Sequence, residues 1–246
     1  MKRVARPLSF AAATLALGAC ASGMVDDSSD PYEGFNRQMY AFNDGLDRSV
    51  IEPAARGYRA VTNEPVRQGV TNFTRNLGEP VIFANEVLQG KIPGAAGTAG
   101  RFVVNTTLGI VGIFDPATSI GLTRSDEDFG QTLGFWGMAS GPYLVLPVIG
   151  ASSPRDAFGL GVDMAANPLN YAEFDGDTAT RVGTSVLGGL SAREGALETV
   201  EDVRDTRLDP YTTLRRFHVR NRAAQIGNRE FAPNEIQEVP DYELDF

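Results

Sequence analysis

Residues 30–46 read DPYEGFNRQMYAFNDGL, and residues 64–77 read EPVRQGVTNFTRNL. Both stretches open with an acidic residue and a proline, and both then place apolar side chains three and four residues apart. Proline fits the first turn of a helix because its missing N–H has no intrahelical partner there, and an acidic neighbour suits the positive end of the helix dipole. The apolar spacing is typical of one helix face. Both stretches are therefore predicted to be amphipathic helices.

The pairing of a capping residue with proline recurs along the chain and predicts further helix starts. The seven pairs are Asp30-Pro31, Glu52-Pro53, Glu64-Pro65, Glu79-Pro80, Asp115-Pro116, Ser153-Pro154 and Asp209-Pro210. Gly90 and Gly109 stand where helices can end. The best strand candidate is residues 143–149, but Pro147 interrupts it. The predicted fold class is all-α, built from many short amphipathic helices.

The N-terminus has the features of a secretory leader that ends at a lipidation site. Three basic residues precede an apolar stretch at 8–17, which is too short to span a bilayer. The tetrapeptide Leu17-Gly18-Ala19-Cys20 resembles a bacterial lipobox, in which signal peptide 1–19 is removed and Cys20 is acylated. An ordinary secretory signal with a chance cysteine is the alternative. Several acyl chains on one residue would anchor the protein durably, and Ala21 favours the outer membrane.

Composition excludes several function classes. The chain has 246 residues and a formal net charge of −9, and an acidic protein is a poor ligand for nucleic acid. Cys20 is the single cysteine, so no intrachain disulfide is expected, and the single histidine, His218, is predicted to lie on a helix surface. No catalytic or phosphate-loop motif is present. The acidic run 126–128 fits a surface loop better than a calcium site. We expect neither an enzyme nor a cofactor or metal.

The segment 94–114 has an unusual surface. Gly94, Gly97 and Gly100 stand three apart with alanines between them, so a helix here would carry a nearly bare face. Either tight helix packing or contact with acyl chains would explain that face. Residues 102–114 are strongly apolar but include Asn105 and Thr106. This pattern fits a segment lying in a membrane interface, or a buried core helix.

The C-terminal third contains two more predicted helices. An amphipathic pattern runs over 177–204, and a second helix begins at Asp209 with a basic side. That side could face lipid head groups, an acidic partner or solvent. The tail 230–246 is acidic and expected to be flexible. The predicted division is a signal peptide (1–19), a lipidated tether (20–29), a helical domain (30–208), and a C-terminal helix with its tail (209–246).

Several motifs resemble the VacJ/MlaA lipoproteins of Gram-negative bacteria. The opening run DPYEGFNR at 30–37, the run DFGQTLG at 128–134 and the triplet Gly141-Pro142-Tyr143 carry the likeness most clearly. It is close over residues 30–170 and looser in the C-terminal helices. The order of so many motifs makes the resemblance specific.

The resemblance implies a disc-like helical protein, embedded in the inner leaflet of the outer membrane, with an amphipathic central channel. Members of this family associate with trimeric porins. They remove phospholipids misplaced in the outer leaflet, pass them to a soluble periplasmic carrier, MlaC, and so maintain lipid asymmetry. A scaffolding lipoprotein that holds porins and transports nothing is the alternative from another class.

Three groups of site residues follow from this expectation. The lipid path is predicted to involve Gly94, Gly97, Gly100, Phe102, Asn105 and Thr106. The loop 121–131, which matches a family hairpin beside the pore, is predicted to act as a gate through Gly121, Arg124, Asp126, Asp128 and Gly130; a passive connection is the alternative. Contact with the carrier is predicted at Arg215, Arg216 and Arg220, although a helix packed on the disc would also explain this segment.

Overall fold

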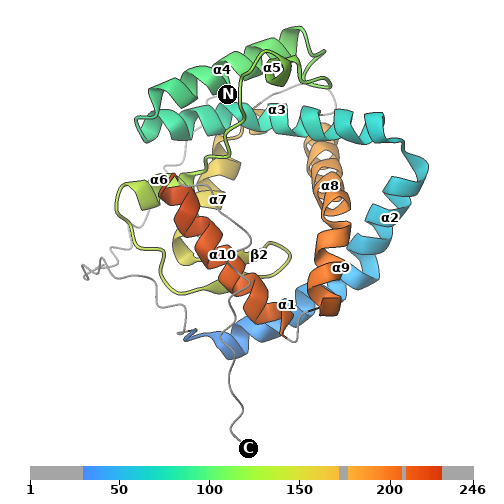
Figure 1. The fold of residues 1–246 in the computed structure, drawn as a ribbon, viewed down its shortest axis with the longest axis vertical. Helices are drawn as coiled ribbons and strands as arrows, with labels where there is room; N and C mark the ends of the chain where they lie inside the picture. Colours follow the sequence, from blue (N-terminus) through green and yellow to red (C-terminus); the bar gives the residue numbers. More distant parts are fainter. Residues whose placement is uncertain (1–29, 172–176, 207–208, 229–246) are drawn as a thin grey trace, which may run out of the picture.

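The computed structural model describes residues 30–171, 177–206 and 209–228. The signal peptide 1–19, Cys20 with its tether, and the tail after residue 228 lie outside the described residues. Viewed down the shortest axis of the molecule, the helices follow a ring (Figure 1). Helices α1 and α2 form its lower and right-hand arcs, α3 crosses the top, and α6, α7 and α10 make up the left-hand side. The all-α prediction is confirmed.

The first arc is one continuous helical run rather than two helices. Helix α1 (Glu33–Leu46) passes through a π-helical turn (η1, Asp47–Ile51) directly into α2 (Glu52–Val61). The predicted start at Glu52-Pro53 is therefore wrong. Proline inside an α-helix clashes with the carbonyl four residues earlier. Here the N–H of Glu52 bonds to the carbonyl of Asp47, five residues back, so the wider turn accommodates Pro53.

Helix α3 (Glu64–Leu88) crosses the ring and also runs through a predicted helix start. Asn63 caps its N-terminus, as expected near Glu64-Pro65, but Pro80 lies inside the helix. The start predicted at Glu79-Pro80 is wrong because the Glu79 side chain does not cap a helix; it pairs with Arg101 instead. Gly90 follows the helix end with φ +72°, as predicted.

Helices α4 to α7 follow in short steps. Helix α4 (Ile92–Thr107) packs along α3, and turns at 108–114 lead to α5 (Pro116–Ser119). Helix α6 (Phe129–Phe135) precedes the hairpin, and α7 (Pro154–Ala166) follows it. The caps of α5 and α7 are Asp115 and Ser153, as their prolines predicted. The cap of α6, Asp128, has no proline after it.

A small antiparallel hairpin replaces the single interrupted strand. Strand β1 (Leu144–Leu146) pairs with β2 (Gly150–Ser152), and Pro147 lies in the turn between them. Two asparagines of α1 bind the hairpin backbone. Asn36 Nδ2 donates to the Tyr143 carbonyl at 3.0 Å, and its Oδ1 accepts from the Val145 N–H at 2.8 Å. Asn43 makes the same pair of bonds with Leu146 and Val148. The two side-chain amides thus bond to backbone groups of the hairpin as the backbone of a third strand would.

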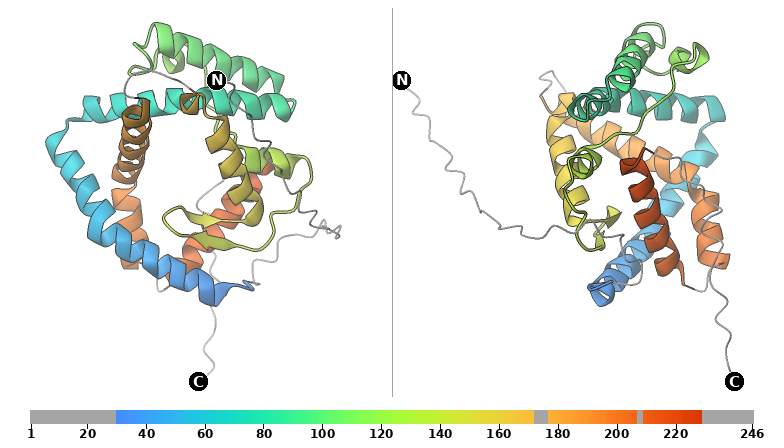
Figure 2. Two further views of the ribbon diagram at one scale, coloured as in Figure 1. Left: turned by 180° about the vertical axis from the view of Figure 1, so that it is seen from behind. Right: turned by 60° about the vertical axis from the view of Figure 1, so that its left-hand side comes forward.

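The C-terminal helices close the ring. After a short 3₁₀ turn (η2, Pro168–Asn170), α8 (Asp177–Gly195) and α9 (Leu197–Thr206) run beside α2 and α1 (Figure 2). The amphipathic run predicted over 177–204 is thus two helices. Helix α10 (Pro210–Ile226), capped by Asp209 as predicted, crosses beside β2 and α6. A compact apolar cluster forms where α1, the hairpin and α10 meet: Tyr143, Val145 and Tyr211, with Met39, Tyr40 and Val219 around them.

We predict that Asn36→Ala destabilises the protein by about 2 kcal/mol or more, because it leaves two buried backbone groups of the hairpin without partners. Thermal unfolding of the detergent-solubilised protein measures the effect. Asn43→Ala is the matched control, since the amide proton of Val148 is more exposed. A drop at Asn36 no larger than the drop at Asn43 would contradict the assignment.

Candidate functional site

The burial of side chains is inverted relative to a water-soluble domain. Among the residues described, the buried set is dominated by polar and charged side chains. The exposed set includes many large apolar side chains, such as Phe42 and Leu108, with 52% and 73% of their surface exposed. Extensive exposed apolar surface marks a protein or membrane contact. No helix in the described part of the chain is both long and apolar enough to cross a membrane.

Helix α4 turns its polar side toward α3 and the start of α5. Asn105 is buried and donates to Asp115 at 2.9 Å, while Thr106 accepts a hydrogen bond from Asn76 at 3.0 Å. Phe102 is half-buried. The buried side of α4 also holds Arg101, 3% exposed, which sequence reasoning missed because its neighbours are apolar.

The three glycines of α4 have different surroundings. A methyl group at Gly94 would lie 2.6 Å from Glu86 Oε1, and one at Gly100 would lie 3.3 Å from a methyl of Leu122. A methyl group at Gly97 would meet nothing within 4 Å. Tight packing therefore explains Gly94 and Gly100, whereas Gly97 leaves open space.

The apolar segment after α4 is an exposed surface rather than a buried core helix. Helix α4 ends at Thr107, and the following turns expose their apolar side chains. Those with more than a third of their surface exposed are Leu108, Ile110, Val111, Ile113 and Phe114. The core-helix alternative for 102–114 is therefore wrong over its second half. These side chains suit contact with an apolar phase.

The loop 121–131 is fastened to the body along its length. Arg124 pairs with buried Glu79 at 3.4 Å and with Asp126 at 2.9 Å. Glu127 accepts from Lys91 at 2.7 Å and from Gln89 at 2.8 Å. Asp126 and Glu127 bind different partners, so the carboxylates of the acidic run do not converge on one point. The described residues contain no group of acidic, His or Cys side chains that is placed to hold a metal ion.

The two glycines that bracket this loop are not equivalent hinges. Gly121 has φ +85° and a methyl group there would meet nothing within 4 Å, which is compatible with a hinge. A methyl group at Gly130 would lie 2.5 Å from Arg222 and 2.7 Å from Asp156. The hinge prediction for Gly130 is therefore wrong, because close packing of α6 requires the glycine.

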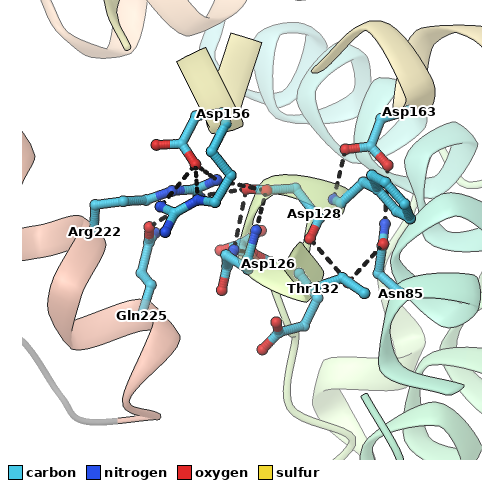
Figure 3. Close-up of polar contacts among 12 residues, drawn as sticks. Asn85, Asp126, Asp128, Thr132, Asp156, Asp163, Arg222 and Gln225 are labelled. Atoms are coloured by element: carbon cyan, nitrogen blue, oxygen red, sulfur yellow. Dashed lines mark hydrogen bonds and ion pairs between the residues drawn. The ribbon is translucent and has the colours of Figure 1, made fainter. Parts of the chain in front are cut away.

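Arg222 of α10 binds both Asp128 at the start of α6 and Asp156 of α7, so one arginine joins three helices (Figure 3). Asp128 caps α6 by accepting from the Gln131 N–H at 2.9 Å, and both its oxygens accept from Arg222 of α10, at 2.5 and 2.6 Å. Arg222 also donates to Asp156 of α7 at 3.0 Å, where Arg155 donates as well. Burial opposes ionisation of Asp128 and Asp156, but Arg222 outweighs it and lowers the pKa of both carboxyls.

A second polar junction ties α3 to α6 and α7. Asn85 donates to Asp163 at 2.9 Å and accepts from Thr132 at 2.8 Å (Figure 3). Asp163 also accepts from the Phe129 N–H at 2.9 Å. Burial raises the pKa of Asp163, although these hydrogen bonds act to lower it. Burial also raises the pKa of Glu79, although the positive charge of Arg124 acts to lower it. Sequence reasoning assigned no role to these carboxylates.

The basic side of α10 is largely turned inward. Arg215 is 8% exposed, so it does not present its charge to a periplasmic partner as predicted. Arg216 is half-buried and Arg220 is exposed. His218 is not an open surface residue either: its ring packs against Tyr143 with the ring centres 5.8 Å apart, and burial lowers its pKa. Arg222 of the same helix forms ion pairs with Asp128 and Asp156 of the body.

Arg215, His218 and Arg222 line a cavity of about 360 Å³ between α10 and the hairpin. A second cavity, of about 190 Å³, lies between α3, η2 and α8. A third, of about 130 Å³, lies between α3, α4 and the segment 115–124. The described residues therefore combine many large exposed apolar side chains with one cavity, between α3, α4 and the segment 115–124, that only polar and charged residues line.

Comparison with known proteins agrees with this geometry. Residues 28–225 match the sequence model of the MlaA lipoproteins. This chain belongs to the MlaA lipoprotein family. It is 33% identical to the intermembrane phospholipid transport system lipoprotein MlaA of Haemophilus influenzae, over 92% of both chains. It is 34% identical to the same lipoprotein of Escherichia coli K12, over 92% of this chain and 90% of that one.

A solved MlaA-like structure has the same fold. It comes from work on the structural basis for maintenance of bacterial outer membrane lipid asymmetry. The two structures superpose with a TM-score of 0.71 and 34% identity, over 80% of this chain and 99% of that chain. The family resemblance found in the sequence is thereby confirmed.

In this MlaA-family chain, we predict that Arg222→Gln lowers the free energy of unfolding by about 3 kcal/mol, because Asp128 and Asp156 lose their shared counter-charge. Chemical or thermal unfolding in detergent measures the loss. Arg220→Gln on the exposed side of α10 is the matched control and should cost well under 1 kcal/mol. Equal losses of unfolding free energy in the two variants would show that the ion pairs of Arg222 stabilise the fold no more than an exposed arginine does.

The stability of the wild type and that of the Arg222→Gln variant should respond differently to acid. Arg222 lowers the folded-state pKa of Asp128 and Asp156 below the ordinary 3.8. Its stabilisation is therefore fully present above pH 3.8 and is lost as pH falls through the lowered values. The stability gap between wild type and Arg222→Gln should narrow below about pH 4. A gap that stays constant to pH 2 would contradict this account.

Proposed function

We propose that this protein removes phospholipids from the outer leaflet of the outer membrane and passes them to a periplasmic carrier, so that lipid asymmetry is maintained. The observation that carries the proposal is the inverted burial: many large apolar side chains are exposed, whereas most of the buried side chains among the described residues are polar or charged. A phospholipid that crosses a leaflet boundary needs a polar lining for its head group and an apolar path for its tails. The named functions of the relatives support the same conclusion.

The protein is proposed to lie in the inner leaflet, anchored through acylated Cys20. The exposed side chains of 108–114 would contact acyl chains, and a central channel inside the ring would carry the lipid. A trimeric porin would hold the disc in place, and a soluble carrier of the MlaC type would receive the cargo. Arg216 and Arg220 stay in the proposed carrier contact, since Arg220 is exposed. Arg215 does not, because it is buried.

We predict that Cys20→Ala retains the leader-dependent export but abolishes lipid removal, because a protein without acyl chains loses its durable anchor in the outer membrane. Deletion cells carrying either protein would be compared by fractionation, by mass spectrometry of the N-terminus, and by labelling of surface phospholipid. The deletion strain alone should accumulate outer-leaflet phospholipid. If it does not, transport is wrong and the scaffold alternative gains support. Full activity of the Cys20→Ala protein would refute anchoring.

The loop 121–131 is proposed to gate the lipid path. Gly121 supplies the hinge, and the contacts of Glu127 with Lys91 and Gln89 hold the loop against α3 and the start of α4. Opening therefore requires that these bonds break. A loop so fastened would stay closed without cargo.

We predict that Glu127→Gln raises outer-leaflet phospholipid above the wild-type level, because losing the ion pair favours the open loop by roughly tenfold and an open path runs in both directions. Asp126, although predicted above as a gate residue, does not tie the loop to the body: its carboxylate is 74% exposed and contacts only Arg124 of the same loop among the described residues. Asp126→Asn is therefore the matched control. Surface labelling of phospholipid in complemented deletion cells gives the readout. Wild-type levels in both variants would mean that the loop is a passive connection.

A further inference from the structure

The cavity between α3, α4 and the segment 115–124 carries more positive than negative charge. Among the described residues, three arginines and two carboxylates line it, and the other lining residues are polar but uncharged. The arginines are Arg75, Arg101 and Arg124, and the carboxylates are Glu79 and Asp115. The lining therefore has one positive charge more than its own carboxylates can balance. A cleft with such an excess attracts an anion.

The excess charge lies at the exposed end of the cavity. At the buried end, Arg101 pairs with Asp115 at 2.9 Å and with Glu79 at 3.4 Å. Arg124 also pairs with Glu79, at 3.4 Å. Arg75, by contrast, is exposed and makes no hydrogen bond or ion pair with the described residues. Both carboxylates of the lining are thus bound by other arginines, and the guanidinium of Arg75 is available for a ligand.

Exposed apolar side chains lie beside this end of the cavity. Asn72, which also lines the cavity, stands one helical turn before Arg75 on α3 and donates to the Ile113 carbonyl at 3.2 Å. The turn 108–114, with its exposed apolar side chains, is therefore packed next to Arg75. A further exposed apolar side chain, Ile120, belongs to the segment that forms another wall of the cavity. An available positive charge next to apolar surface matches an anion that carries apolar chains.

We infer that Arg75 binds the phosphate of a membrane phospholipid at the exposed end of this cavity, and that the acyl chains of this lipid lie over the turn 108–114. A guanidinium can donate two parallel hydrogen bonds to a phosphate. The apolar part of an arginine side chain packs along apolar surface while its charged end reaches the head-group layer. Because all phospholipids carry the phosphate, the site recognises the class rather than one head group. The inference rests on the proposed function, since it assigns a protein contact to the transported lipid.

Photocrosslinking of lipids to the full-length detergent-solubilised lipoprotein tests the inference. The probes are phosphatidylglycerol, phosphatidylcholine and diacylglycerol, each with a diazirine at the same position of the same acyl chain, and mass spectrometry maps the crosslinked residues. Both phospholipids should label the turn 108–114 about tenfold more than diacylglycerol does, because hydrogen bonds to a charged group add about that factor in affinity. Equal labelling by all three lipids would overturn the site. Labelling by phosphatidylglycerol alone would overturn recognition of the phosphate in favour of net charge.

Two variants locate the effect. Arg75→Gln should reduce phospholipid labelling of the turn 108–114 about tenfold and leave diacylglycerol labelling unchanged. Arg48→Gln is the matched control: Arg48 is also exposed and its loss changes the net charge equally, but it pairs with Asp44 and does not line the cavity. An equal reduction in both variants would refute the assignment. Unchanged labelling in Arg75→Gln would also refute it, and would leave an acidic side chain of a partner protein as the ligand of Arg75.

Two further measurements separate a lipid from a free anion, and this site from the proposed function. Inorganic phosphate at millimolar concentration and constant ionic strength should not reduce the labelling, because it gains nothing from the apolar turn. Displacement of the lipid by inorganic phosphate would indicate a site for the free anion and overturn the lipid assignment. Surface phospholipid in deletion cells tests transport independently. Absence of accumulation there overturns transport, whereas labelling that does not depend on Arg75 overturns only the phosphate site.

Discussion

The polar face of α3 is the constraint on which the rest of the ring depends. Its buried carboxylates and amides are costly to leave without partners in a low-dielectric interior, and Asn76, Glu79 and Asn85 each use part of their bonding capacity to hold another element. Asn76 bonds to α4, Glu79 to α4 and the loop after α5, and Asn85 to α6 and α7. Apolar packing alone would not choose among these neighbours, because it is non-directional. The hydrogen bonds and ion pairs of α3 therefore set the positions of four segments: α4, the loop after α5, α6 and α7.

Ion pairs close the opposite side of the ring in the same way. Arg204 of α9 contacts Asp44, Asp47 and Glu52, and Arg193 of α8 contacts Asp47, all at the junction of α1 and α2. These side chains are partly buried, so their attraction is screened less than that of surface pairs. The π-helical turn at Asp47–Ile51 lies at the same junction. The residues at the junction of α1 and α2 thus form the π-helical turn and also attach this run of helices to α8 and α9.

Exposed apolar side chains and a largely polar buried set together suit a protein that contacts acyl chains while it handles a polar head group. The exposed turn 108–114 and the polar cavity beside it combine both properties within one region. The family assignment rests on sequence and fold, whereas transport and the gate are proposals that follow from this distribution of polarity. The fastened loop 121–131 makes the gate a question of breaking identified bonds rather than of general flexibility.

The sequence by itself determined the helical class, five of the seven helix starts, the C-terminal helix from Asp209 and the family, because caps, prolines and apolar spacing are local signals. It did not predict that helix would continue through Pro53 and Pro80, since a π-helical turn and the pairing of Glu79 with Arg101 depend on neighbouring structure. Nor did it predict which charges are buried. Arg101, Arg215 and Glu79 resemble surface residues until partners from distant segments surround them. Only the tertiary structure brings those partners together, because the pairing energy of a buried charge comes from residues that are remote in sequence.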